Sequence, residues 1–236
     1  GILAHASTTD YSVYGIPKEF PEIIKGKAGS PYAIRDYYDV DPDLAVNVQE
    51  RMAEFEQLIK RTHEIGLKVI IDNVPNHVAR NYKSVSKPLN ISDFGENDDV
   101  TKAFSPQNNF YYLPGQHLEI VHRHGNIKEN KYVEFPAKVT GNDSFTNRPS
   151  QNDWYDTVKL NYGVDYLNNN EEWFDPIPDT WYKMKDILMF WADKGVDGFR
   201  CDMAEMVPVA FWRWSIPQIK AKHPGIIFIA EIYNPS

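Results

Sequence analysis

Three acidic side chains stand directly after short, mainly apolar runs that have the composition of buried strands. They are Asp72, Asp202 and Glu231. In a parallel barrel the carboxyl ends of the strands point toward the active site, so acids at three equivalent positions should converge on one pocket. A single acid at such a position is more often a helix cap or a loop residue. The coincidence of three therefore predicts a carboxylate-lined functional site.

The pair of Asp202 and Glu231 has the residue types that retaining glycoside hydrolysis needs. Neighbouring strands lie ~4.8 Å apart, so the two carboxyl groups can approach the separation of about 5 to 5.5 Å that retaining glycosidases use. Arg200 precedes Asp202 by two residues and points to the same face of the strand, so we expect it to lower the pKa of Asp202 and favour this residue as the nucleophile. Glu231 has no adjacent cation, and desolvation should raise its pKa, as a general acid requires. Taken alone, Arg200 and Asp202 are equally consistent with a structural ion pair.

Other side chains have the chemistry to bind a sugar. His77 can donate to a sugar hydroxyl or form a hydrogen bond within its own loop, and the sequence leaves both readings open. Aromatic side chains can stack on sugar faces, although most should form the core of the segment that carries them. These aromatic residues are Phe110, Tyr111, Tyr112, Trp154 and Tyr155.

Helix and strand patterns alternate around the three acids. Apolar residues at three-to-four spacing predict helices, and the short apolar runs predict strands buried on both faces of a parallel sheet. Asp179 is expected to cap the second helix. The expected helices cover residues 47–64, 179–194 and 208–221, and the expected strands cover residues 68–72, 196–200 and 226–230. This order predicts a parallel α/β fold.

The periodicity disappears over residues 78–165, which is far longer than an ordinary loop of ~12 to 15 residues. We expect an inserted subdomain there, and we expect the first forty residues to form a long loop and no strand. The fold class predicted is α/β, a partial (β/α)8 TIM barrel of about strands 3 to 5 with an irregular insertion after strand 3. The expected units are residues 1–77 of the barrel, the insertion at 78–165 and the barrel continued at 166–236.

Composition excludes several classes of protein. The net charge of −8 provides no overall cationic field for nucleic acid or for an anionic membrane surface. No apolar run approaches the roughly 18 residues that a membrane span needs. The single cysteine, Cys201, excludes an internal disulfide. The oligomeric state and the compartment stay open, although a polysaccharide substrate would favour export to the periplasm or the medium.

Four segments, in order, resemble the α-amylase family of glycoside hydrolases. Three of them resemble its first three signature regions, and one resembles the loop before its third barrel strand. The loop segment is SPYAIRDYY at 30–38. The three signature regions are, in order, VIIDNVPNH at 69–77, GFRCD at 198–202 and AE at 230–231. The resemblance implies a catalytic barrel, a domain B inserted after the third strand, and retaining hydrolysis or transfer at α-glucosidic bonds of starch-like or maltooligosaccharide substrates.

The resemblance also implies roles for individual residues. Asp202 would be the nucleophile, Glu231 the acid and base, and Arg200 the charge partner of the nucleophile. Tyr32 would be the aromatic platform under the sugar, and His77 would bind one of its hydroxyls. The remaining two matched residues would lie near the site without reacting: Asp72 would brace the pocket, and Asn76 would border domain B.

Three departures from the family pattern change the expectations. The fourth signature region, with a third carboxylate, does not occur in this sequence, so we expect the chain alone to be inactive and its longer parent to be active. Lys159 stands where many members have a calcium-binding Asp, and an ammonium group cannot ligate a cation, so we expect no cofactor and no structural calcium. Glu205 and Met206 replace a Lys-His pair that holds the leaving sugar in many amylases.

Two other functions fit parts of the pattern. In the first, an enolase-like lyase, Asp72, Asp202 and Glu231 would bind Mg²⁺. Against it, Arg200 would place a positive charge beside the metal, and no lysine stands at a strand end as the base. The second is a sugar-binding relative that has lost catalysis, and the presence of both acids together with Arg200 disfavours it.

Overall fold

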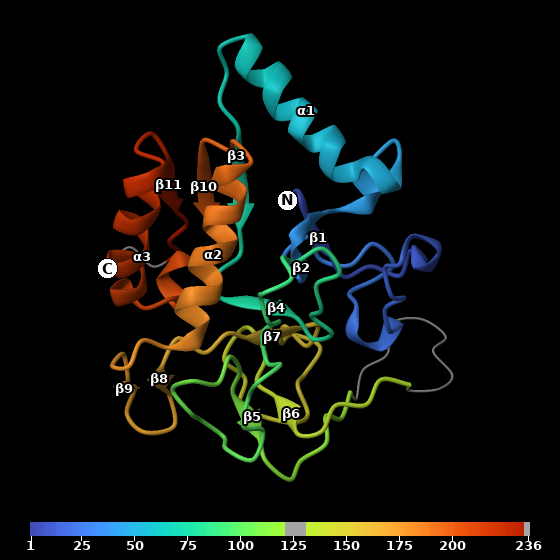
Figure 1. Ribbon diagram of the computed structural model, residues 1–236. Helices are drawn as coiled ribbons and strands as arrows, with labels where there is room; N and C mark the ends of the chain where they lie inside the picture. Colours follow the sequence, from blue (N-terminus) through green and yellow to red (C-terminus); the bar gives the residue numbers. More distant parts are fainter. Residues whose placement is uncertain (121–130, 234–236) are drawn as a thin grey trace.

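A three-stranded parallel sheet carries the predicted acids. The computed structural model describes residues 1–120 and 131–233. Strand β10 (Gly198–Cys201) lies between β3 (Ile70–Asn73) and β11 (Ile227–Ala230), and both pairings are parallel (Figure 1). The register sets Arg200 opposite Asp72. The three predicted strands are therefore confirmed, and those that precede Asp202 and Glu231 are neighbours.

Three helices alternate with these strands, as the sequence predicts. They are α1 (Arg51–Glu64), α2 (Asp179–Asp193) and α3 (Val209–Lys222). Asp179 does not cap α2, because Pro178 occupies the cap position and the Asp179 carboxylate instead contacts Asn109 and Lys183. Short 3-10 helices cover Ser12–Tyr14, Pro21–Ile23, Pro42–Leu44, Val48–Glu50 and Ala204–Met206.

The expectation of a loop over the first forty residues is wrong. Strand β2 (Ile34–Val40) forms an antiparallel pair with β1 (Leu3–His5), and every residue of β2 is buried. The Tyr, Pro and Gly residues of this stretch favoured a loop, and the two aspartates of β2 are not typical of a buried strand. Asp36 accepts hydrogen bonds from Ser84 and from backbone groups, and Asp39 forms an ion pair with Arg51 of α1. Buried charge is tolerated here because partners distant in sequence satisfy it.

Between β3 and α2 the strands in the described part of the chain form short antiparallel pairs, drawn in the lower half of Figure 1. Strand β4 pairs with β7, β5 with β6, and β8 with β9. Their bounds are His77–Ala79 for β4, Tyr112–Leu113 for β5, Ala137–Lys138 for β6, Thr157–Lys159 for β7, Val164–Asp165 for β8 and Glu171–Glu172 for β9. Within residues 1–120 and 131–233 the sheets do not close into a barrel.

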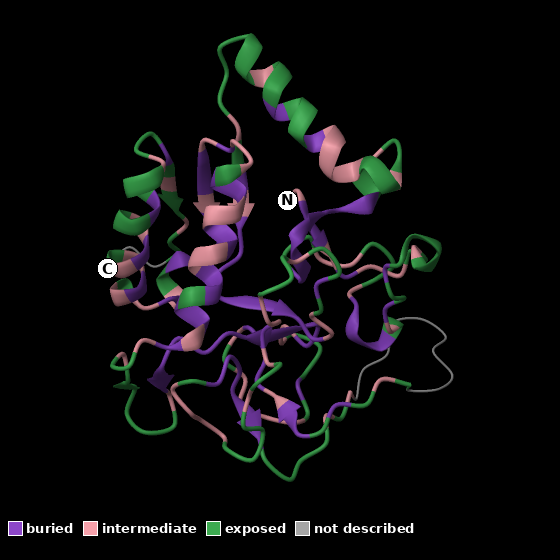
Figure 2. Ribbon diagram, in the orientation of Figure 1, coloured by how far each residue is buried: buried purple, intermediate pink, exposed green. Residues whose placement is uncertain are grey.

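Buried aromatic side chains of α2 pack against the rest of the molecule. Figure 2 shows the central strand β10 as mainly buried, whereas the edge strand β11 is mostly exposed. Trp191 donates its indole N–H to the carbonyl of Tyr37 at 2.7 Å, and Trp181 donates to the carbonyl of Tyr162 at 3.0 Å. Each indole thus buries a large apolar area without leaving its polar group unsatisfied. In the described part of the chain no helix is long and apolar enough to cross a bilayer.

Candidate active site

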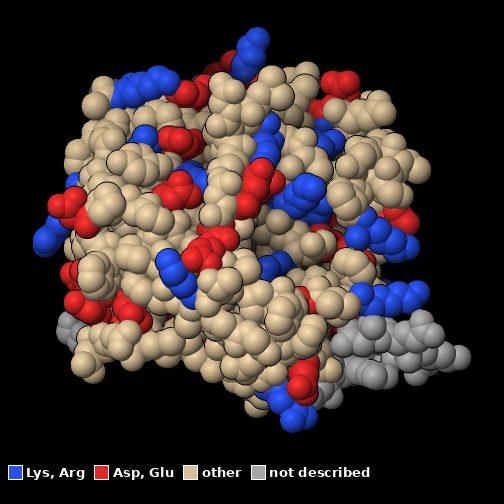
Figure 3. All heavy atoms as spheres, turned by 60° about the horizontal axis from the view of Figure 1, so that its bottom comes forward, with Lys and Arg blue, Asp and Glu red and all other residues tan. Residues whose placement is uncertain are grey.

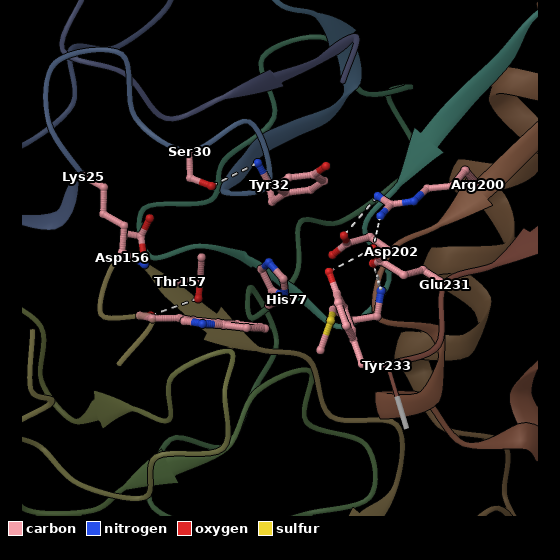
Figure 4. A pocket seen from close by; sticks show the side chains of 12 residues that line it. Lys25, Ser30, Tyr32, His77, Asp156, Thr157, Arg200, Asp202, Glu231 and Tyr233 are labelled. Carbon is pink, nitrogen blue, oxygen red and sulfur yellow. Dashed lines mark hydrogen bonds and ion pairs between the residues drawn. The ribbon is translucent and has the colours of Figure 1, made fainter. Parts of the chain in front are cut away.

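A cavity of about 250 Å³ lies at the carboxyl ends of β10 and β11. The loop before β2, strand β4, the segment leading into β7 and the ends of β10 and β11 all contribute to it (Figure 4). The lining residues are Lys25, Ser30, Tyr32, His77, Trp154, Asp156, Thr157, Arg200, Asp202, Met203, Glu231 and Tyr233. The cavity falls below the ~300 to 1,000 Å³ of pockets for drug-sized ligands, so it suits a ligand of a few sugar units at most.

The guanidinium group of Arg200 joins all three predicted acids. Its Nη1 lies 3.0 Å from Asp72 and 3.1 Å from Asp202, and its Nη2 forms an ion pair with Glu231. The two candidate catalytic carboxylates therefore face each other, as the adjacent strands predict. Asp72 contacts Arg200 from outside the cavity lining. This position agrees with a bracing role.

The protonation order is the reverse of the expectation from sequence. Burial raises the pKa of Asp202 to about 6, and Glu231 acts in the same direction through a hydrogen bond and its charge, whereas Arg200 opposes them. Burial also opposes ionisation of Glu231, but its hydrogen bonds and the charge of Arg200 outweigh this effect, and the pKa of Glu231 is lowered. Arg200 contacts both acids, so it does not favour Asp202 alone. The Asp202 side chain is only 9% exposed, against 19% for Glu231, so desolvation affects Asp202 more.

Two residues that the sequence did not single out hold the Glu231 carboxylate. The backbone N–H of Met203 donates to one oxygen at 3.1 Å, and the hydroxyl of Tyr233 donates to the other at 3.0 Å. Met203 has φ of +47°, a left-handed conformation that is uncommon for a residue with a side chain. Such strain is concentrated at functional sites, where surrounding contacts maintain it.

His77 is a buried, neutral member of the cavity wall. Burial, together with the positive charges of Lys159 and Lys25, lowers its pKa to about 3. Its ring lies 5.1 Å from that of Trp154, and its Nδ1 lies 3.2 Å from the amide nitrogen of Asn76. A neutral imidazole has one donor and one acceptor nitrogen, which suits a hydroxyl ligand.

Aromatic side chains divide into one cavity group and one core group. Tyr32 lines the cavity with its ring 5.7 Å from the Arg200 guanidinium, and Trp154 lines the same cavity. The other four candidates are almost fully buried and belong to the core: Phe110, Tyr111, Tyr112 and Tyr155. Of the five aromatic residues in this segment with sugar-stacking potential, the structure therefore places Trp154 alone at the cavity.

Lys159 is the last residue of β7, and its side chain contacts the segment that follows β3. Its ammonium group lies 2.6 Å from an oxygen of Asp143 and donates to the side-chain oxygen of Asn76 at 3.0 Å. The amide of Asn76 in turn donates to the carbonyl of Gly141 at 2.8 Å. Calcium requires six to eight oxygen ligands. At this position the ammonium group of Lys159 contacts two of the oxygens, those of Asp143 and Asn76.

Sequence patterns overlooked several other cavity residues. Tyr233 lies two residues after Glu231 and beyond the end of β11, so strand alternation did not indicate it. Lys25 and Asp156 are 131 positions apart, and nothing local to either residue indicates that they meet.

Acidic and basic side chains are interspersed on the face shown in Figure 3, with no extended patch of one sign.

The fold and the site together define a parallel α/β protein with a carboxylate-lined cavity at its strand ends. The family model described as "Alpha amylase, catalytic domain" matches residues 23–225. The chain belongs to the α-amylase family, which confirms the resemblance seen in its motifs. Membership implies that the open sheet is part of a (β/α)8 barrel.

Similar proteins include enzymes and a transporter subunit. An α-amylase structure from Lactobacillus plantarum is similar, with a TM-score of 0.54 and 26% identity over 97% of this chain and 36% of that chain. An α-1,4-glucan:maltose-1-phosphate maltosyltransferase of Cereibacter sphaeroides is 40% identical over 58 residues, 25% of this chain and 10% of the relative. The human amino acid transporter heavy chain SLC3A1 is 29% identical over 177 residues, 75% of this chain and 21% of the relative. The chain thus spans about a third or less of these relatives.

Proposed function

We propose that this chain carries the catalytic acids of a retaining glycoside hydrolase or transglycosidase that acts on α-glucosidic bonds of maltooligosaccharides. The observation that carries the proposal is the pair of Asp202 and Glu231, which come from adjacent parallel strands, share Arg200 and face one sugar-sized cavity. Membership in the α-amylase family and relatives named as amylase and maltosyltransferase support the bond type.

Asp202 is the proposed nucleophile and Glu231 the proposed acid and base. Protonated Glu231 donates its proton to the glycosidic oxygen while an oxygen of ionised Asp202 bonds to the anomeric carbon, and the bond to the leaving sugar breaks. Water, or a sugar hydroxyl in a transfer reaction, then attacks the anomeric carbon. Glu231, now a carboxylate, accepts the proton of that nucleophile, and Asp202 leaves as a carboxylate.

This mechanism requires one proton to move when substrate binds. In the free structure the two carboxyl groups interact through a hydrogen bond, and the pKa of Asp202 is raised to about 6 while that of Glu231 is lowered, so Asp202 binds a proton more readily than Glu231. A sugar entering between the two acids places its glycosidic oxygen beside Glu231 and excludes water from it. Loss of water raises the pKa of Glu231 and favours transfer of the shared proton from Asp202 to Glu231.

His77 and Tyr32 are the proposed binding residues for the sugar in the cleavage position. The neutral ring of His77 has a donor for a hydroxyl, and the half-exposed Tyr32 ring provides an apolar face for the sugar ring. Both residues line the same cavity as the two acids. Asp72 is proposed to keep Arg200 in place and to take no direct part in the reaction.

We also propose that residues 78–165 form domain B and that Lys159 replaces calcium at its junction with the barrel. Strands β4 and β7 at the two ends of this segment pair with each other. The ammonium group of Lys159 joins Asn76, just before the segment, to Asp143 within it. An internal cation at this junction makes a bound metal ion unnecessary for holding the two parts together.

The alternative functions differ in what the acids would do. For the enolase-like lyase, Mg²⁺ would have to occupy the space between the acids where the Arg200 guanidinium makes its three contacts. A non-catalytic role has one point in its favour, since one relative is named as a transporter heavy chain. That role predicts no turnover and no covalent intermediate, so the experiment below separates it from the proposal.

The test uses the protein expressed from its complete gene. A fluorinated α-glucosyl fluoride that slows the second step should esterify the enzyme, and mass spectrometry of peptides should locate the sugar on Asp202. Asp202→Asn should lose at least 10³-fold in kcat, whereas Asp186→Asn, an exposed control on α2, should retain normal turnover. A label on another residue, or normal turnover by Asp202→Asn, would refute the assignment.

A further inference from the structure

An ion pair lies at the end of the cavity away from the acids. The ammonium group of Lys25 is 3.1 Å from Oδ1 of Asp156, and both residues line the cavity. Figure 4 shows Lys25 and Asp156 on one side of the cavity and Arg200, Asp202 and Glu231 on the other. None of the proposed catalytic steps uses this pair.

Asp156 is a buried anchor, and Lys25 is the more accessible member of the pair. The Asp156 side chain is 2% exposed and that of Lys25 is 38% exposed. Burying a carboxylate is costly unless a counter-charge compensates it, and within the described residues Lys25 is the cation that does so. Among the described residues, Oδ1 of Asp156 receives no hydrogen bond in addition to this ion pair.

Lys25 keeps hydrogen-bonding capacity for a ligand. An ammonium group has three donors, and across residues 1–120 and 131–233 the contacts of Lys25 are the ion pair with Asp156 and the face of the Tyr155 ring at 5.5 Å. Its charge also acts on the cavity wall, since it helps to lower the pKa of His77. Lys25 and the proposed sugar-binding residue His77 line the same cavity, so the ammonium group is placed to take part in binding.

We propose that Lys25, positioned by Asp156, is a specificity residue that donates hydrogen bonds to hydroxyls of the second sugar unit, next to the one held at the acids. This inference rests on the proposed function. Lys25 and Asp156 line the cavity on the side away from the acids. We therefore expect the site to prefer a short α-glucan, with one end of the glucan next to this ion pair. The ligand is an uncharged sugar and not a phosphorylated one, because Asp156 already neutralises the charge of Lys25.

The decisive variant is Lys25→Met in the protein expressed from its complete gene, because methionine retains much of the side-chain length without the donors. The control is Lys27→Met, which alters an exposed lysine on the same loop. With maltotriose, Lys25→Met should raise KM by roughly ten-fold or more and leave kcat nearly unchanged, since a hydrogen bond to a charged group is lost. With 4-nitrophenyl α-glucoside, which has one sugar unit, KM should not change.

The outcomes separate this inference from the proposed function. If Lys25→Met behaves like the control with both substrates while Asp202→Asn is inactive, the role of Lys25 is refuted and the catalytic proposal stands. If Lys25→Met impairs turnover of maltose 1-phosphate alone, Lys25 binds an anion and the inference is also wrong. Asp156→Asn should reproduce the KM effect on maltotriose, and rescue of Lys25→Met by added alkylammonium ions would further support the assignment.

Discussion

Replacement of Asp202 by Asn should stabilise the protein at alkaline pH, although it abolishes the proposed reaction. The folded structure raises the pKa of Asp202 from 3.8 to about 6, so folding favours the protonated acid. Below about pH 4 the carboxyl group is protonated in both the folded and the unfolded state, so it does not make the free energy of unfolding depend on pH. Between about pH 4 and pH 6 the unfolded state ionises while folded Asp202 keeps its proton, so the wild type loses stability relative to the Asn variant, and above about pH 6 this loss is complete.

The size of this effect follows from the shift in pKa. At ~1.36 kcal/mol per unit, the shift corresponds to about 3 kcal/mol at most. Solvent reaches the cavity and screens the carboxylate, so we expect about 1 to 2 kcal/mol. For a protein of this size, the melting temperature of Asp202→Asn should then exceed that of the wild type by about 2 to 8 °C at pH 8.

The assay is thermal unfolding followed by circular dichroism at pH 4, 6 and 8, with Asp186→Asn as the matched surface control. The difference in melting temperature between Asp202→Asn and the wild type should grow with pH, and that of the control should stay constant. A difference that is independent of pH, or one that favours the wild type at pH 8, would show that burial does not raise the pKa of Asp202.

Two further predictions concern residues next to the catalytic pair and at the junction. Lys159→Met should cost about 3 to 5 kcal/mol of unfolding free energy in urea, because Asp143 and Asn76 lose a buried partner, and a calcium chelator should not change the stability of the wild type. Tyr233→Phe removes a hydrogen bond to Glu231, so the pKa of Glu231 should rise. The acidic limb of the pH profile of kcat/KM should then shift to higher pH by about several tenths of a pH unit.

Controls make both results interpretable. Lys60→Met alters an exposed lysine on α1 and should leave the urea midpoint unchanged. Destabilisation of the wild type by the chelator would disprove the replacement of calcium by Lys159. Tyr182→Phe, an exposed tyrosine on α2, should not move the acidic limb. If Tyr233→Phe leaves the limb in place, the hydroxyl of Tyr233 does not control the protonation of Glu231.

Local sequence determined the elements that carry the acids. Apolar periodicity and short apolar runs predicted α1, α2, α3 and the three parallel strands, because these patterns reflect local backbone geometry. Burial of the strands on both faces was not a local property, since the edge strand β11 is mostly exposed. The position of Asp202 two residues after Arg200, and of both acids at strand ends, was also sufficient to predict that they meet. These relations depend on strand geometry alone.

Tertiary structure decided what depends on partners distant in the chain. Strand β2 is buried although it contains Asp36 and Asp39, because Ser84 and Arg51 satisfy these acids. The pKa of Asp202 is raised and that of Glu231 is lowered because the fold buries Asp202 more deeply and supplies hydrogen bonds to Glu231. Desolvation and long-range pairing are properties of the packed molecule, so no local pattern in the sequence reveals them.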